Sequence, residues 1–181
     1  MTAVSELLAR QHALYTSGNP TRRWLHCARR DCIRATLRRV AAAGAPTALE
    51  VGPGSGVYTP LLADRVTVSD REDAYLGGLA PLVAARPHVV LVRDDITRSA
   101  LPAGRFDVVL CSEVIEHLTD SPRARSGMRR LLRPGGTLIL STPQRHSSLE
   151  VLAKIAFLPG VIDLVRLIYR EPILATGQST C

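Results

Sequence analysis

The chain has 181 residues, of which 46% are hydrophobic and 22% are charged. Both fractions are typical of globular proteins, so the composition argues against intrinsic disorder, a collagen-like repeat and a coiled coil. The four cysteines include no CxxC pair, which argues against a disulfide framework and a structural zinc site. The net charge is +7, from 23 basic and 16 acidic residues, and by itself it does not establish nucleic-acid binding.

Residues 1–46 are predicted to form an N-terminal helical cap. From Pro20 to Ala43, apolar residues recur at helical spacing, and Gly44 is suited to end the helix. The other face of this helix is basic; a solvated charged face is the simpler interpretation and a binding face is the alternative. Its arginines are Arg22, Arg23, Arg29, Arg30, Arg34 and Arg38.

Five short apolar runs rich in β-branched residues follow this helix: TALEV, VTVS, VVLV, FDVVLCS and TLILST. Segments of helical or turn character separate them. Strands that consist of continuous apolar runs are typically buried on both faces of a parallel sheet covered by helices. The sequence therefore predicts an α/β core over residues 47–143, with a doubly wound, Rossmann-like and mostly parallel sheet.

A glycine-rich loop, LEVGPGSG, ends the first of these runs. Gly52, Gly54 and Gly56 allow tight turning and close approach of the backbone to a ligand. Val57 stands where the dinucleotide-binding fingerprint needs its third glycine. This spacing disfavours NAD as the ligand.

Acidic residues lie at the ends of the second and third predicted strands. Asp70 comes 20 residues after Glu50, where a carboxylate can accept hydrogen bonds from both hydroxyls of a ribose. In the string RDDIT, Asp95 is suited to bind an adenine amine and Ile96 to pack on the adenine face. These positions predict a nucleoside site at the carboxyl ends of the strands.

Five strings, LEVGPGSG, VTVSD, RDDIT, FDVVLCSEVIEHL and LLRPGGTLILSTP, resemble in this order the motifs of class I S-adenosylmethionine-dependent methyltransferases. The resemblance covers residues 47–143. It implies that S-adenosylmethionine is the cofactor, with its amino group on Glu50 and its sulfonium near Ser112 and Glu113. The implied cofactor-binding residues are Glu50, Gly52, Gly54, Gly56, Asp70, Asp95, Ile96, Ser112 and Glu113.

The string EVIEH follows the fourth predicted strand and offers candidate catalytic groups. If it forms a helical turn, Glu113, Glu116 and His117 share one face. It resembles the metal motif of ubiquinone-pathway O-methyltransferases and of RNA 3′-end 2′-O-methyltransferases, which implies Mg²⁺ at these three residues. The alternative is that no metal binds and that His117, next to Glu116, is the general base, with His146 as a further base or ligand.

Residues 144–181 depart from the resemblance, because a full class I sheet has seven strands and only five strand-like runs are present. We expect the C-terminal strand hairpin to be missing, either because the chain is truncated or because helices or a partner cover the fifth strand. Residues 147–169 are strongly apolar. They are predicted to form helices that pack as a lid, pair with a second copy of the chain or lie on a membrane surface.

The resemblance implies a methyltransferase, and the apolar N-terminal helices and residues 149–169 lead us to expect a small, apolar or lipid-like hydroxyl compound as its acceptor. The chain lacks a signal peptide and a spanning segment, so we expect a cytoplasmic protein, peripheral at a membrane if residues 147–169 bind one. Few aromatic residues are available to stack bases, which argues against a nucleic-acid partner. The arginine face keeps an RNA methyltransferase open, and a truncated, non-catalytic methyltransferase-like protein is the third interpretation.

Overall fold

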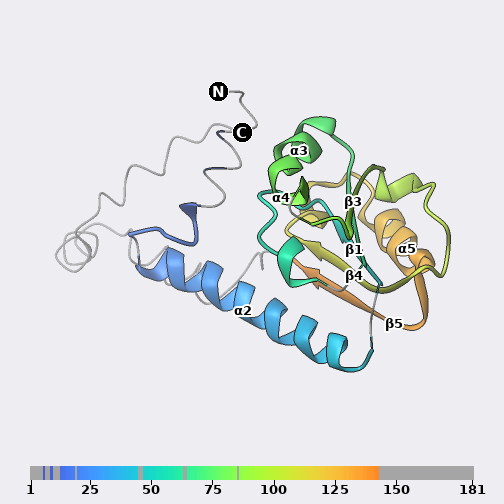
Figure 1. The fold of residues 1–181 in the computed structure, drawn as a ribbon, viewed down its shortest axis with the longest axis horizontal. Helices are drawn as coiled ribbons and strands as arrows, with labels where there is room; N and C mark the ends of the chain where they lie inside the picture. Colours follow the sequence, from blue (N-terminus) through green and yellow to red (C-terminus); the bar gives the residue numbers. More distant parts are fainter. Residues whose placement is uncertain are drawn as a thin grey trace.

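A single five-stranded sheet forms the centre of the computed structural model, which describes residues 6, 9, 13–18, 20–44, 47–62, 65–84 and 86–142. The strand order is β3-β2-β1-β4-β5, and all four pairings are parallel (Figure 1). The predicted parallel sheet is therefore confirmed. The strands are β1 (Thr47–Val51), β2 (Arg65–Asp70), β3 (Val89–Arg93), β4 (Phe106–Ser112) and β5 (Leu132–Ser141).

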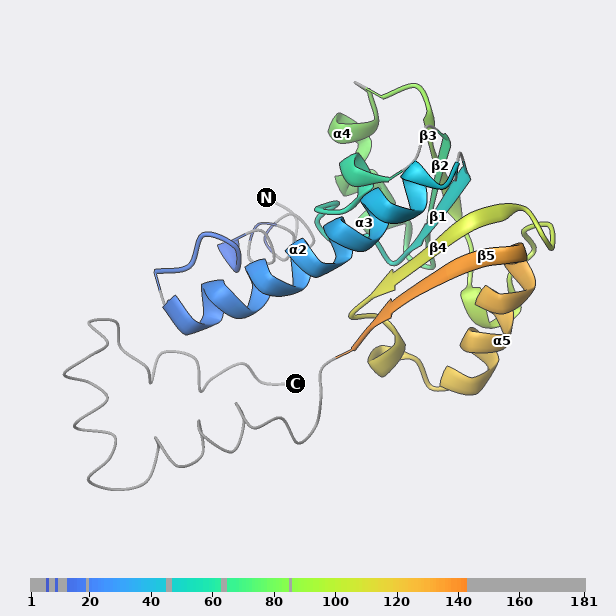
Figure 2. The ribbon, with the colours of Figure 1, turned by 90° about the horizontal axis from the view of Figure 1, so that it is seen from below.

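Helices cover both faces of the sheet, as expected of a doubly wound fold (Figure 2). Helix α5 (Ser121–Leu131) packs on one face, where its apolar residues join Leu49 and Val109 in one cluster. Helix α2 (Pro20–Ala42) lies on the other face, through Ile33 and Leu37. The short helices α3 (Asp73–Gly78) and α4 (Ala80–Ala84) follow β2, and Leu76 of α3 packs on that strand.

Strand alternation explains this division of the core. Ala48 and Val108 face α2, while Leu49 and Val109 face α5, and all four side chains are almost completely buried. Because β1 and β4 are covered on both faces, nearly every position in them is apolar, which is why these runs could be predicted from sequence.

The direction in which successive strands are added to the sheet reverses next to β1, and this reversal determines where a ligand can bind. From β1 the chain runs outward to β3 and then returns to place β4 on the other side of β1. The connections that leave β1 and β4 therefore diverge, and open α/β sheets bind ligands at such a point, outside the carboxyl ends of the strands.

Strand β5 starts earlier than the predicted run TLILST, because Leu132 already pairs with Phe106. A register irregularity follows between Phe106 and Val108. Near it, Arg133 Nε lies 2.5 Å from Oδ1 of the buried Asp107. This ion pair lies at the amino end of β4, opposite the ligand-binding edge.

The predicted C-terminal helices over residues 147–169 lie outside the described residues. Within the described part of the chain, no helix combines the length and the apolar character that crossing a membrane requires.

Candidate functional site

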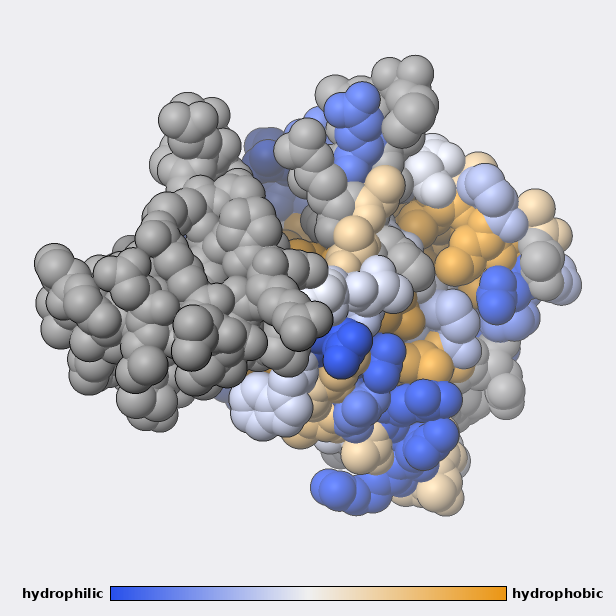
Figure 3. Space-filling model, turned by 90° about the vertical axis from the view of Figure 1, so that its left-hand side faces the viewer, coloured by the Kyte–Doolittle hydropathy of each residue, from blue (hydrophilic) through white to orange (hydrophobic). Residues whose placement is uncertain are grey.

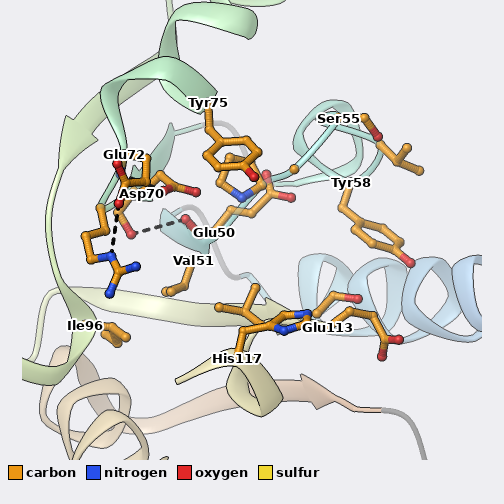
Figure 4. A pocket seen from close by; sticks show the side chains of 18 of the residues that line it. Glu50, Val51, Ser55, Tyr58, Asp70, Glu72, Tyr75, Ile96, Glu113 and His117 are labelled. Atoms are coloured by element: carbon orange, nitrogen blue, oxygen red, sulfur yellow. Dashed lines mark hydrogen bonds and ion pairs between the residues drawn. The ribbon is translucent and has the colours of Figure 1, made fainter. Parts of the chain in front are cut away.

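A cavity of about 630 Å³ opens at the carboxyl ends of β1, β2 and β4. Its volume is in the range of small-molecule sites. Figure 4 shows side chains from the loop after β1, from the ends of β2 and β4 and from the segment after β4 around one space. Of the predicted site residues, the following line the cavity: Glu50, Gly52, Gly54, Asp70, Asp95, Ile96, Ser112, Glu113 and His117.

The glycine loop after β1 has a left-handed backbone at Gly52, Gly54 and Gly56. A Cβ on Gly52 would lie 2.5 Å from Val114 Cγ2, so the loop can approach the segment after β4 only without a side chain there. Gly56 does not line the cavity. A Cβ at this position would lie 2.7 Å from Leu79 Cδ2. This glycine is needed for packing against the α3–α4 region.

Glu50 is almost completely buried and lies at the centre of the cavity wall. Thr59 Oγ1 donates a hydrogen bond of 2.5 Å to its Oε2. Burial raises the pKa of Glu50 to about 7, and the bond from Thr59 only partly opposes this shift. This carboxyl group can therefore gain or lose a proton near neutral pH, according to the charge of what binds beside it.

Two further carboxylates lie along β2 and β3. Asp70 Oδ1 accepts a hydrogen bond from Glu72 N at 2.9 Å, and burial raises the pKa of Asp70. Asp95 caps the short 3₁₀ helix η2 (Ile96–Arg98), where its Oδ1 accepts from Thr97 N and Thr97 Oγ1. These bonds with Thr97 are the main reason why the pKa of Asp95 is lowered. Asp95 thus remains charged and holds the loop that presents Ile96.

Glu113 follows β4 and is the one non-glycine residue of the described chain with a left-handed backbone, at φ 57°. Its Oε2 lies 2.9 Å from Arg29 Nη1 of helix α2, and Ser141 Oγ donates to its Oε1 at 3.3 Å. Burial raises the pKa of Glu113, and the charge of Arg29 partly opposes this. The carboxylate is therefore held between α2 and β5.

The predicted helical turn with Glu113, Glu116 and His117 on one face is wrong. Only Ile115–His117 form a short 3₁₀ helix, η3, and the left-handed backbone of Glu113 lies before it. Glu116 is exposed and does not line the cavity. No cluster of three or more His, Cys, Asp or Glu side chains suited to a metal forms among the residues that the structure describes. The predicted Mg²⁺ site at these three residues therefore has no support, and His146 lies outside the described residues.

Helix α2 and the segment before it supply a wall of the cavity whose residues were not among the predicted site residues. We call Leu14, Tyr15, His26 and Arg29 the helix wall; all four line the cavity. The Tyr15 ring meets the His26 ring edge-on, with centroids 5.9 Å apart. Burial is the main cause that raises the pKa of Tyr15, so its hydroxyl stays protonated at neutral pH.

The assignment of Arg29 to the charged outer face of the helix is wrong. Arg29 precedes Ile33 by four residues and Leu37 by eight, so the three side chains share the inward face. An arginine in register with buried apolar residues was the signal that could have located it. Arg23, Arg34 and Arg38, in contrast, are exposed. In the view of the molecule in Figure 3, hydrophilic side chains gather in the lower part, the level at which α2 lies in Figure 1.

Comparison with protein families gives a match over residues 49–140 to a family described as methyltransferase domain. A ubiquinone biosynthesis O-methyltransferase of Pseudomonas paraeruginosa is 34% identical over 117 residues, covering 60% of this chain and 49% of the relative. A probable S-adenosylmethionine-dependent methyltransferase of Mycolicibacterium smegmatis is 38% identical over 100 residues, covering 54% of this chain and 38% of the relative. The chain thus matches half or less of the length of these relatives.

Solved structures share the fold at low sequence identity. An amino pentose methyltransferase from Micromonospora echinaspora, solved with S-adenosylmethionine bound, gives a TM-score of 0.55 at 22% identity, over 65% of this chain and 50% of that one. The [4+2]-cyclase SpnF gives a TM-score of 0.53 at 19% identity, over 64% and 48% of the two chains. A fold shared by proteins with such different names does not define a reaction, which must be argued from the site.

Proposed function

The chain belongs to the methyltransferase domain family, and on this premise we propose that it transfers a methyl group from S-adenosylmethionine to the hydroxyl group of a small, apolar acceptor. The single observation that carries the proposal is the placement of Glu50, Asp70 and Asp95 around one cavity at the switch point of a parallel sheet. The relative from Pseudomonas paraeruginosa, named as an O-methyltransferase, supports oxygen as the acceptor atom.

The chemistry of the donors and acceptors in this cavity fits the cofactor. Asp70 would accept hydrogen bonds from the ribose hydroxyls, and Ile96 would pack on the adenine. Asp95 Oδ2 accepts from Arg98 Nε at 3.2 Å and retains a second lone pair for the adenine amine. Buried Glu50 would accept the cationic amino group, which favours the charged form of a carboxyl whose pKa is about 7.

S-adenosylmethionine supplies a methyl group that its sulfonium already activates. The protein therefore has to orient the acceptor, exclude water and accept the hydroxyl proton. Leu14, Val114 and Leu118 give the cavity an apolar lining suited to an apolar acceptor. Of the cavity side chains that can accept a proton, the carboxylate of Glu113 and the imidazole of His117 lie in the segment after β4, close to Val114 and Leu118 in the sequence.

Calorimetric titration with the demethylated product, S-adenosylhomocysteine, tests the cofactor site. We expect binding to the wild-type chain and at least a tenfold loss of affinity in Asp70→Ala, because a partly buried acceptor of two hydrogen bonds is removed. Asp73→Ala is the matched control, since Asp73 pairs with Arg93 at 3.2 Å and does not line the cavity. Absence of binding to a folded wild-type chain would overturn the proposal.

A second pair of variants tests the glycine loop. Gly54 and Gly104 both have left-handed backbones, so alanine strains the chain at either position. Only Gly54 lines the cavity. We expect Gly54→Ala to lower the affinity for S-adenosylhomocysteine and Gly104→Ala to leave it unchanged, whereas equal losses would mean that the loop does not contact the cofactor.

The acceptor atom is tested with labelled S-adenosylmethionine and eight-carbon compounds that differ only in bearing a hydroxyl, an amino or a thiol group. Transfer to the hydroxyl compounds is the expected result. Transfer confined to the amines or thiols would contradict O-methylation while leaving the cofactor site intact.

A further inference from the structure

One ion pair crosses the cavity between helix α2 and the end of β4. Arg29 Nη1 lies 2.9 Å from Glu113 Oε2, and the two side chains are only 22% and 27% exposed. The other carboxylate oxygen of Glu113 accepts a hydrogen bond from Ser141 Oγ. Because separate elements hold the two oxygens, the direction of this carboxylate is fixed at the cavity wall.

The backbone of Glu113 is strained, and a purely structural ion pair does not need this strain. A left-handed conformation at a non-glycine residue costs about 1–3 kcal/mol and is typical of functional sites. Helix α2 is already anchored through Ile33 and Leu37, which are 4% and 5% exposed in the core. A partly buried ion pair adds little stability beyond such packing. The conformation instead presents the carboxylate to the cavity.

The guanidinium of Arg29 is unlike the other cationic groups of the cavity. Arg71 also lines the cavity, but its side chain is 67% exposed and pairs with Glu72. Arg29 is sheltered, and its ion pair with Glu113 is made through a single nitrogen, Nη1. A guanidinium carries five donors in a planar fork that matches a carboxylate. Arg29 can therefore hold a second carboxylate, or exchange Glu113 for one.

We propose that Arg29 binds a carboxylate of the methyl acceptor and that Glu113 takes the proton of a neighbouring hydroxyl, so that the substrates are 2- or 3-hydroxy acids with an apolar tail. The inference rests on the proposed function. The spacing of the carboxylate and the hydroxyl in the substrate follows from the geometry of the ion pair. Arg29 Nη1 and Glu113 Oε2 are only 2.9 Å apart, so a substrate that contacts both must carry its carboxylate and its hydroxyl on the same or adjacent carbons. The apolar lining formed by Leu14 and Leu118 takes the tail.

Binding of such an acid places the hydroxyl against the base. The acceptor carboxylate takes other donors of the Arg29 guanidinium while Nη1 keeps its contact with Glu113 Oε2, so the neighbouring hydroxyl lies within reach of that oxygen. The hydroxyl proton passes to Glu113 Oε2, and the acceptor oxygen forms a bond to the methyl carbon. The carbon–sulfur bond breaks, and its electron pair remains on sulfur.

The surroundings of Glu113 favour it over His117 as the base. His117 is exposed to solvent, whereas Glu113 is mostly buried. The charged groups that face Glu113 are Arg29 from α2 and Glu116 and His117 from η3. A base that is shielded from water and fixed in direction contributes more to proton transfer than an exposed side chain.

The binding step is tested by calorimetry on the 181-residue chain saturated with S-adenosylhomocysteine, using 3-hydroxyoctanoate and its amide as probes. We expect the wild-type chain to bind the acid at least tenfold more tightly than the amide. Arg29→Met should abolish this preference and leave the affinity for S-adenosylhomocysteine unchanged. Arg34→Met, an exposed arginine of the same helix, is the matched control and should retain the preference.

Three results would overturn this step. Equal binding of acid and amide, or no binding of the acid, would exclude carboxylate recognition. A loss of S-adenosylhomocysteine affinity in Arg29→Met, with the acid preference kept, would assign Arg29 to the cofactor. Failure of the wild-type chain to bind S-adenosylhomocysteine at all would instead remove the proposed function, and this inference with it.

The role of Glu113 as the base is tested by the rate of methyl transfer to 3-hydroxyoctanoate. Glu113→Gln should lower kcat at least 100-fold without weakening binding of the acid, because glutamine cannot take the proton. The wild-type rate should rise with pH as Glu113 ionises, and this rise should be absent in the variant. An unchanged kcat, or the same pH profile in both, would exclude Glu113 as the base. Transfer to 8-hydroxyoctanoate at the same rate would contradict the required spacing.

Discussion

The two sides of the cavity differ in how the chain builds them. We call the side formed by Glu50, the glycine loop, Asp70 and Asp95 the strand wall; its residues lie at or just after the carboxyl ends of strands. The helix wall uses a helix whose position depends on packing across the sheet. The comparison teaches that the proposed cofactor site is encoded in short local motifs, while the proposed acceptor site depends on contacts between segments far apart in the chain.

The largest effect on stability is expected at the close contact between helix α5 and Ile96, next to Asp95 of the strand wall. A Cβ on Gly127 of α5 would lie 2.3 Å from the carbonyl oxygen of Ile96, which follows Asp95. We expect Gly127→Ala to lower the free energy of unfolding by about 3 kcal/mol through overpacking, measured by urea denaturation. Helical Gly77 has no atom within 4 Å of a Cβ, so Gly77→Ala should raise stability by about 0.5–1 kcal/mol. Similar changes in both variants would refute the role of the contact.

The next effect concerns the charge of Glu50 at the centre of the strand wall. Its pKa is about 7 in the folded chain and 4.5 when the side chain is fully solvated, as in the unfolded chain, so the folded state binds the proton more tightly. The contribution of Glu50 to stability is then fully present below pH 4.5 and is lost as pH rises to about 7, by up to about 3 kcal/mol. Glu50→Gln should flatten this fall in stability between pH 4.5 and about pH 7, and parallel pH profiles for the two proteins would contradict it.

The raised pKa of Glu50 also predicts how binding of S-adenosylhomocysteine depends on pH. The cationic amino group of the ligand favours the ionised form of Glu50, so affinity for S-adenosylhomocysteine should rise as pH increases through about 7. Calorimetry on either side of this value, at about pH 6 and about pH 8, measures the change. Glu50→Gln should bind with an affinity that changes less over the interval.

The smallest effect on stability is expected for the ion pair between Arg29 of the helix wall and Glu113 after β4. A double-mutant cycle with Arg29→Met and Glu113→Gln should give a coupling energy of about 1 kcal/mol, because both side chains retain some contact with water. The coupling should weaken with added salt. A coupling above about 3 kcal/mol would mean that the two side chains hold each other too firmly for Arg29 to bind an acceptor carboxylate as well.

Most of the fold could be predicted from the sequence. The helix predicted from Pro20 to Ala43 is observed as Pro20–Ala42, and the runs TALEV and FDVVLCS coincide with β1 and β4. These predictions succeed because burial on both sheet faces, or on one helix face, leaves a pattern within the segment itself. The early start of β5 could not be predicted, since it depends on pairing between Leu132 and Phe106.

The sequence by itself determined the α/β class, the order of the strand motifs and the residues of the strand wall, because each of these is expressed in a contiguous string. Only the tertiary structure decided that Arg29 faces the cavity, that Glu113 turns toward it and that Glu116 does not line the cavity. The physical reason is that a helix pattern sets which side chains share a face, whereas packing against the sheet decides what that face meets. A left-handed residue likewise depends on neighbours from other segments, here α2 and β5, which hold the carboxylate of Glu113 from two sides.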